Sequence, residues 1–237
     1  AGVSLWVPVG SRDEGARTAG SSHFLEHLRG KGTNKRSALD IAVAFDSVGG
    51  ESNAETAREH TAYWARVRDA DLDMAIETLT DMVTDSRLDE ADFSMERGVI
   101  LDELAMGEDS PTDTVHDDFQ LAVHGDHPIG RPVGGTAQAI RDVERADVWE
   151  HYQAHYGPSS LIVAAAGNVD HESVCERVQA ALEGSPWDAR SAASPRPRRS
   201  TTVNPIPEHD KDITRRRDVT QAHVVIGCEG LAATDPA

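Results

Sequence analysis

The segment His23-Phe24-Leu25-Glu26-His27 places two histidines four residues apart, with a glutamate directly before the second. On a helix, residues four apart lie on one face about one turn from each other, so both imidazoles can reach the same ion. Zn²⁺ accepts neutral imidazole nitrogen and suits a tetrahedral site with one position open for water. The spacing predicts a zinc site with His23 and His27 as ligands. Glu26 would then lie beside the water and could take its proton.

Two histidines leave the ligand set incomplete, and we expect a carboxylate from another element to complete it. The helix predicted from about Asp89 to Glu108 carries Glu96 and Glu103, seven residues apart and therefore on one side. One of them could bind the metal while the other orients a ligand histidine through a hydrogen bond. A plain alternative stays open at this point. The His-Glu-His face and the glutamate pair could both be solvated polar surface.

The elements that must position these side chains follow from apolar spacing and turn residues. The opening run from Val3 to Val9 alternates and predicts a strand, and Ser21 or Ser22 can cap the helix that carries the histidines. Strands and helices then mix without strict alternation, which indicates an α+β fold with a mixed, mostly antiparallel sheet and helices packed on one face. The other expected helices begin at Ser37 and cover 71–85, 89–108, 112–124, 146–156 and 170–183. The other expected strands cover 51–56, 60–67, 159–167 (as a buried strand) and 222–228.

Composition excludes several classes of protein. The chain has 237 residues and a formal net charge of −18, which disfavours general binding to nucleic acid. No apolar run approaches the ~18 residues of a membrane span. The two cysteines, Cys175 and Cys228, cannot form a disulfide framework. The first 189 residues hold 15 basic and 35 acidic residues, whereas the remainder holds 8 and 6. The break coincides with a stretch rich in Pro, Ser and Arg, which is typical of an extended linker.

Together these motifs resemble the M16 family of zinc metallopeptidases, the pitrilysin, insulin-degrading enzyme and mitochondrial-processing-peptidase group, also called inverzincins. The bacterial, processing-peptidase-like members are the most similar. The resemblance covers nearly the whole chain. It rests on Gly10-Ser11-Arg12-Asp13-Glu14, His23–His27 with Lys31-Gly32-Thr33, Gly49-Gly50, Asn53-Ala54, Thr56, Glu59, Thr61, Tyr63, Glu96-Arg97-Gly98-Val99-Ile100, Glu103, Glu108-Asp109-Ser110-Pro111, His127-Pro128-Ile129-Gly130, Gly135-Thr136 and Ala166-Gly167-Asn168-Val169.

The resemblance implies roles for particular residues. His23, His27 and Glu103 would bind one zinc ion, because the family's third ligand lies 76 residues after the second histidine. Glu26 would be the general base and Glu96 the carboxylate that orients a ligand histidine. Asn53 and Ala54 would lie on an edge strand to which a substrate peptide adds. The alternative for Asn53 is a polar residue satisfied locally at a strand end. The implied activity is zinc-dependent endopeptidase cleavage of peptides or unfolded protein segments, on the fold shared by LuxS and the processing peptidases.

The resemblance also implies a domain organisation. We expect an M16-like metal-binding domain over 1–184, a linker over 185–207, and the start of an incomplete second homologous domain over 208–237. The chain would then be a fragment truncated at both ends, whose partner is a second M16-like domain or subunit. The Arg-Tyr pair of the family's second half is absent. Leu28-Arg29 also departs from the usual Met and apolar pair after the motif.

Two alternative functions stay open. One is a non-catalytic or partner-dependent M16-like subunit that scaffolds or presents peptides. The other is a zinc hydrolase of another substrate class on a related fold. We expect no nucleic-acid or membrane partner and a cytoplasmic location in a bacterium, with a targeting signal ahead of Ala1 left open.

Overall fold

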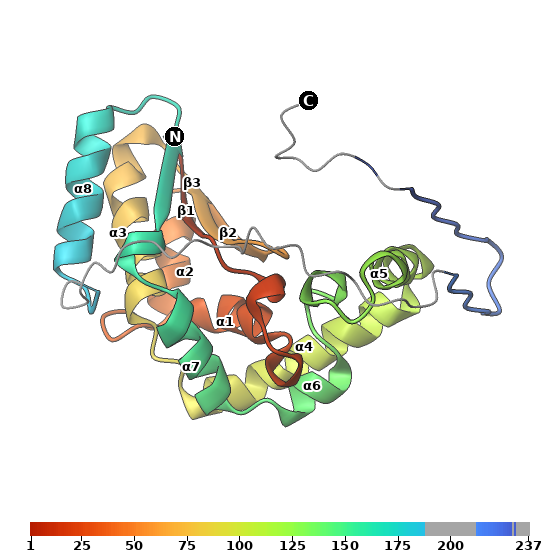
Figure 1. Ribbon diagram of the computed structural model, residues 1–237. Helices are drawn as coiled ribbons and strands as arrows, with labels where there is room; N and C mark the ends of the chain where they lie inside the picture. The colour runs from red at the N-terminus through yellow and green to blue at the C-terminus, as the bar shows by residue number, and fades with distance from the viewer. Residues whose placement is uncertain (188–211, 229, 231–237) are drawn as a thin grey trace.

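The computed structural model describes residues 1–187, 212–228 and 230. Within them the chain forms the four strands and eight α-helices of Figure 1. The strands are β1 (Gly2–Val7), β2 (Glu51–Thr56), β3 (Thr61–Arg66) and β4 (Ile162–Ala166). The helices are α1 (Ser21–Arg29), α2 (Ala38–Asp46), α3 (Leu72–Asp85), α4 (Glu90–Asp109), α5 (Pro111–His124), α6 (Ala137–Asp142), α7 (Arg145–His155) and α8 (His171–Glu183). Short 3-10 helices are η1 (Ser11–Asp13), η2 (Ala16–Thr18), η3 (Asp69–Asp71), η4 (Pro128–Gly130) and η5 (Pro158–Ser160).

The four strands form one sheet in the order β2-β3-β1-β4, and every pairing is antiparallel. Leu5 in the middle of β1 lies opposite Tyr63 of β3 on one side and Val163 of β4 on the other. Alternate residues of β1 are buried, so one face of the sheet meets the core and the other faces outward. The outward face carries Trp6, whose ring lies 5.0 Å from that of His60.

Helices cover the buried face of the sheet. α3 packs on β1 and β3, α1 packs against β2, and α8 lies on the outer side of α3. The rings of Phe24 on α1 and Phe93 on α4 stack with centroids 4.3 Å apart, which joins the long helix α4 to this layer. The expected α+β class, with an antiparallel sheet and helices on one face, is confirmed.

Local sequence explains where the helices start. Ser37 caps α2 because its Oγ accepts from the Asp40 N–H while Asp40 accepts from the Ser37 N–H. α4 ends at Asp109. Ser110 caps it and is followed by Pro111 at the first position of α5, where a proline costs no hydrogen bond. The proline therefore separates two helices without breaking either one.

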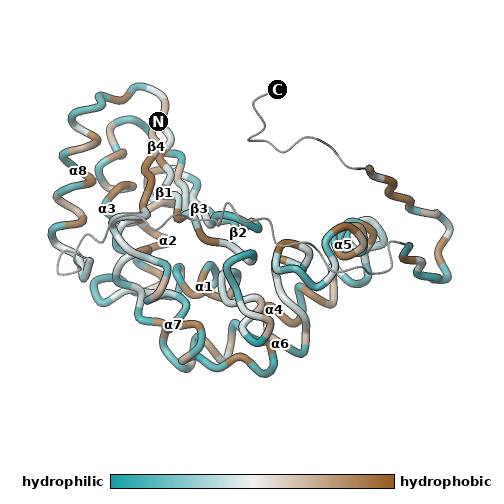
Figure 2. The backbone as a smooth tube through the Cα atoms, viewed as in Figure 1, coloured by the Kyte–Doolittle hydropathy of each residue, from teal (hydrophilic) through white to brown (hydrophobic). Residues whose placement is uncertain are grey.

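The prediction of a buried strand over residues 159–167 is correct for the strand but wrong for its burial. β4 is the last strand of the described sheet, and its residues alternate between exposed and half-buried. Ile162 is 58% exposed. The tube in Figure 2 is coloured as hydrophobic along β4, so an apolar strand sequence here marks an edge rather than the centre of the sheet.

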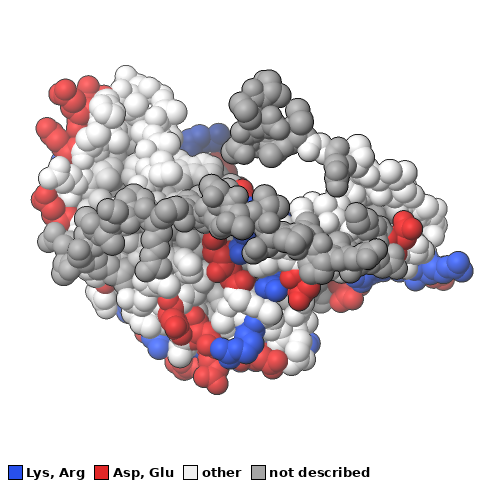
Figure 3. Space-filling view, in the orientation of Figure 1, with Lys and Arg blue, Asp and Glu red and all other residues white. Residues whose placement is uncertain are grey.

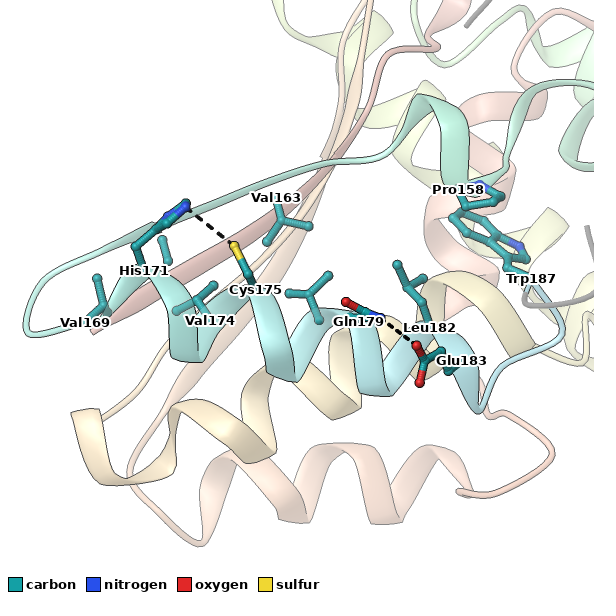
Figure 4. A pocket seen from close by; sticks show the side chains of 12 residues that line it. Pro158, Val163, Val169, His171, Val174, Cys175, Gln179, Leu182, Glu183 and Trp187 are labelled. Atoms are coloured by element: carbon teal, nitrogen blue, oxygen red, sulfur yellow. Dashed lines mark hydrogen bonds between the residues drawn. The ribbon is translucent and has the colours of Figure 1, made fainter. Parts of the chain in front are cut away.

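An apolar groove runs between β4 and α8, with a volume of about 670 Å³. Figure 4 shows Val163 of β4 facing Val174, Cys175 and Leu182 of α8 across it. None of the histidines or glutamates expected to bind zinc lines this groove. It is therefore separate from the candidate metal site described below.

The strand expected at 222–228 is not formed. Residues 212–228 have no regular secondary structure, and Val224 and Ile226 are 75% and 89% exposed. A strand needs a neighbour for its backbone groups, and none of β1–β4 pairs with this segment. Arg215 does contact α5, because its guanidinium donates to both carboxylate oxygens of Asp118. Residues 188–211, 229 and 231–237, with most of the expected linker and part of the expected second domain, lie outside the described residues.

Candidate metal centre

The helix that carries the histidine pair is held at its start by Glu14. Gly20 precedes α1 with φ 96°, a left-handed conformation that glycine adopts readily. The buried carboxylate of Glu14 accepts the backbone N–H groups of Gly20 and Ser22, each at 2.6 Å. Burial raises the pKa of Glu14 to about 7, although these two bonds act in the opposite direction. The first turn of α1, which contains His23, is therefore fixed by its own capping carboxylate.

Three donor atoms converge beside α1. Nε2 of His23 lies 3.2 Å from Nε2 of His27, and Oε2 of Glu103 lies 3.6 Å and 3.3 Å from these two nitrogens. α1 supplies both histidines and α4 supplies the glutamate. In a tetrahedral zinc site with ligand bonds of about 2.0 Å, the donor atoms lie roughly 3.3 Å apart. The spacing of the three donor atoms matches that of zinc ligands, and imidazole nitrogen and carboxylate oxygen are donors that zinc accepts, so the donor set fits a zinc ion.

Glu96 lies behind His27 and does not join the donor set. Its Oε2 is 2.9 Å from His27 Nδ1, and its Oε1 is 2.7 Å from the ammonium of Lys31. Burial alone would raise the pKa of Glu96, but the bonds to Lys31 and His27 lower it below its usual value. An ionised Glu96 accepts from Nδ1–H, which leaves the Nε2 lone pair of His27 directed at the other donors.

His23 is neutral in this environment. Burial and the neighbouring His27 lower the pKa of His23 to about 4. Its Nδ1 is buried without a hydrogen-bond partner among the described residues. The ring lies against Gly134, where an added Cβ would be 3.5 Å from Nδ1. A neutral imidazole keeps one nitrogen lone pair, so His23 can serve as a metal ligand at neutral pH.

The structure places Glu26 on α1 directly before His27, half-buried, and not within the three-residue donor set. Tyr63 of β3 is fully buried, which raises the pKa of its hydroxyl well above the usual value, and the charge of Glu26 is among the smaller contributions. The assignment of Glu26 as the residue that acts on the attacking water stays a prediction.

Asn53 and Ala54 lie in the middle of β2, the strand at the other edge of the described sheet. The Asn53 side-chain oxygen accepts from the Ala54 N–H at 2.8 Å, which is the locally satisfied arrangement that the sequence left open. The end of β2 reaches α1, because the Thr56 hydroxyl lies 3.5 Å from the carbonyl oxygen of Ser22. β2 is thus the edge strand that runs towards the histidine helix.

Two residues around this site were not assigned a role from sequence. Lys31 was named only as part of a motif. Its spacing of four residues from His27 nevertheless indicates that the two side chains can lie close together. Arg29 is fully buried, and its guanidinium carbon lies 4.0 Å from the ring centroid of Tyr152 and 5.4 Å from that of Tyr156. Tyr152 lies in α7 and Tyr156 caps its C-terminal end, and sequence spacing around α1 does not indicate this contact.

Charged side chains are spread over the face of the molecule that Figure 3 shows. On the face in Figure 3, Asp and Glu side chains form several separate groups, with Lys and Arg between the lower ones. Among the described helices, none combines the length and apolar character that crossing a membrane requires.

Comparison with known proteins identifies the family. The model for insulinase (peptidase family M16) matches residues 1–137, and the model for the peptidase M16 inactive domain matches residues 142–237. The chain therefore belongs to peptidase family M16. The second match begins before the expected linker. Residues 142–187 nevertheless pack with the first part of the chain, since β4 pairs with β1 and α8 packs on α3.

Individual relatives agree with this assignment. An uncharacterized zinc protease of Streptomyces coelicolor is 48% identical over 232 residues, which are 98% of this chain and 50% of that protein. Human cytochrome b-c1 complex subunit 1 is 34% identical over 99% of this chain and 48% of its own length. A protease from Helicobacter pylori of known structure superposes with a TM-score of 0.75 at 28% identity, covering 78% of this chain and 45% of that one. The chain spans about half the length of these relatives.

Proposed function

We propose that this chain is the metal-bearing part of a zinc endopeptidase that hydrolyses peptides or unfolded protein segments. The observation that carries the proposal is the convergence of His23, His27 and Glu103, whose donor atoms all lie within 4.8 Å of one another. Membership of family M16 and the zinc-protease relative support the same activity.

The proposed chemistry divides between the metal and the chain. When bound, Zn²⁺ supplies a Lewis acid that lowers the pKa of water towards ~7 and polarises the scissile carbonyl. His23, His27 and Glu103 would hold it, and Glu96 would keep His27 in the tautomer with a free Nε2. Glu26 would take the proton of the attacking water and deliver it to the departing amine, a contribution of about 10²–10⁴ in rate.

We propose that the substrate binds in extended form along β2. Its outer edge pairs with no strand of the described chain, so backbone N–H and C=O groups are available for an added peptide. A peptide at this edge must displace the bond between Asn53 and the Ala54 N–H. Both residues would then contact the substrate backbone, close to where β2 meets α1.

The working enzyme would need a second M16-like domain or subunit, because this chain spans half of its curated relatives. A second candidate function is a non-catalytic subunit that scaffolds or presents peptides. The relationship to cytochrome b-c1 complex subunit 1 favours it, as that relative is named as part of a larger complex. The complete donor set and Glu26 favour the peptidase instead.

Zinc binding and hydrolysis can be tested separately. Titration of the chain against a chelator should show a single zinc ion, and His27→Ala and Glu103→Ala should abolish its binding. In the full-length protein, Glu26→Gln should keep the metal and lose cleavage of an unfolded peptide. Stoichiometric zinc in either ligand variant would refute the site. Zinc binding without cleavage in the full-length protein would favour the scaffolding subunit.

A further inference from the structure

Lys31 is connected to the candidate zinc site through a chain of two hydrogen bonds. Its ammonium donates to Glu96 Oε1 at 2.7 Å, and Glu96 Oε2 lies 2.9 Å from His27 Nδ1. The Glu96 side chain is only 3% exposed, whereas that of Lys31 is 37% exposed. Each oxygen of a nearly buried carboxylate therefore has its own partner, one cationic and one imidazole.

The loop that carries Lys31 is fixed at several points. The next residue, Gly32, forms an isolated bridge with Ser37, and Thr33 forms one with Ser86. The Thr33 hydroxyl also donates to the buried carboxylate of Asp81 on α3 at 2.7 Å. Gly32 has φ 124°, and a Cβ there would lie 2.9 Å from the guanidinium of Arg87. The loop that holds Lys31 next to Glu96 is therefore fixed in two ways. It is hydrogen-bonded to α3 through Thr33, and it is bridged within itself between Gly32 and Ser37.

The consequence for His27 follows from carboxylate geometry. A carboxylate with a single hydrogen-bond partner can rotate about its terminal torsion, which is broad and only weakly restricted. Two partners on opposite oxygens fix the plane of the group. Glu96 then holds His27 Nδ1–H in one direction, and with it the direction of the Nε2 lone pair towards His23 and Glu103.

We propose that Lys31 is a positioning residue for the metal site and acts on His27 through Glu96. This inference rests on the proposed zinc site and adds a residue to it that touches neither metal nor substrate. Lys31 would affect the orientation of His27, which is itself a ligand in the proposed site.

The charge of Lys31 has an opposite effect on zinc affinity, which must be separated from the positioning effect. An ammonium near a dication repels it, so the loss of a partly exposed lysine at this range would tighten zinc binding by about two- to five-fold. Loss of a residue that orients a ligand weakens metal binding by about 10- to 100-fold. The repulsion acts through space and does not depend on Glu96, whereas the positioning effect does.

A double-mutant cycle on the chain, with zinc affinity measured by chelator competition, separates the two effects. In the otherwise wild-type chain, Lys31→Met should weaken zinc binding by about tenfold. In a Glu96→Gln chain, the same change should leave the affinity equal or a few-fold tighter. Lys31→Arg, which keeps the charge and the donor, should restore most of the affinity.

Lys35→Met provides the matched control. Lys35 lies on the same loop, but its ammonium donates to the Gly184 carbonyl oxygen at 3.3 Å, away from the metal site. Its removal should leave zinc affinity unchanged, and thermal unfolding of the apo variants checks that each one folds. An equal effect of Lys31→Met in both Glu96 backgrounds, or no effect at all, would overturn the proposal. A wild-type chain that binds no zinc would instead refute the proposed function.

Discussion

Arg29, two residues after His27, is a buried cation that contacts residues far from it in the sequence. Its Nη1 donates to the Val83 carbonyl oxygen at 3.3 Å, while Nε and Nη2 have no hydrogen-bond partner among the described residues. The flanking rings of Tyr152 and Tyr156 offer cation–π attraction but no counter-charge. A buried cation with unmet donors costs free energy that an apolar side chain of similar reach would not.

We therefore expect Arg29→Met to stabilise the chain by about 1–2 kcal/mol. Methionine is unbranched and of similar length, so it removes the two unmet donors and keeps apolar contact with the tyrosine rings. Arg29→Lys is the contrasting variant and should destabilise, because it retains the charge but loses the planar stacking. Urea unfolding of the metal-free chain measures both, and a lower midpoint for the methionine variant would contradict this account.

At the same scale, the residue pattern defined part of the metal site and left part open. Spacing within one helix was enough to put His23 and His27 together. Spacing could not decide between Glu96 and Glu103, because seven residues place both on the same side of α4. The structure separates them by depth, with Glu96 buried behind His27 and Glu103 half-exposed beside both Nε2 atoms. Burial of this kind depends on tertiary packing, which a single helix sequence does not contain.

At the scale of elements, α1 and α7 are joined by a buried polar contact. Ser22 Oγ lies 3.0 Å from His151 Nε2, and both side chains are buried. Burial and the neighbouring His155 lower the pKa of His151 to about 3. His151 is thus neutral when folded, although it takes up a proton near pH 6.5 once unfolded.

This difference predicts a stability loss in mild acid. Because the folded pKa lies below the unfolded value, the unfolded state binds more protons between about pH 3 and 6.5, and stability falls as the pH drops through that window. Between pH 7.5 and 5.5 the wild-type chain should lose about 1.4 kcal/mol more than a His151→Gln variant, whose amide does not titrate. Parallel urea titrations at the two pH values test this, and equal losses would rule out His151 as the source.

Most elements could be predicted from apolar periodicity, and the misses have physical reasons. α6 was not predicted, since six residues from Ala137 to Asp142 are too few to show a helical period. The burial of β4 was wrong because Ile162-Val163-Ala164-Ala165-Ala166 is equally apolar at the centre or the edge of a sheet. Whether a neighbouring strand is present decides the exposure of such a run, and that information is not local.

At the scale of the whole molecule, a bound zinc ion would link α1 to α4. A ligand that binds only the folded state stabilises it by mass action, by about 2.7 kcal/mol at one hundred times its dissociation constant. We expect zinc to raise the unfolding midpoint of the wild-type chain relative to the same chain in chelator. Glu103→Ala should show no such rise, because it leaves both histidines on a single helix. An equal rise in that variant would mean that α4 does not contribute to the site.

The sheet order also has a consequence for the order of synthesis. β1 lies between β3 and β4, yet Leu5 pairs with Val163, which is translated 158 residues later. At about 5–20 residues per second, β1 leaves the ribosome roughly 10 to 30 s before its second neighbour exists. During that interval one edge of β1 is open and its apolar side chains lack part of their cover. The nascent chain is therefore exposed to wrong pairing at the open edge of β1 until β4 has been made, which is after both helices that carry the candidate zinc ligands.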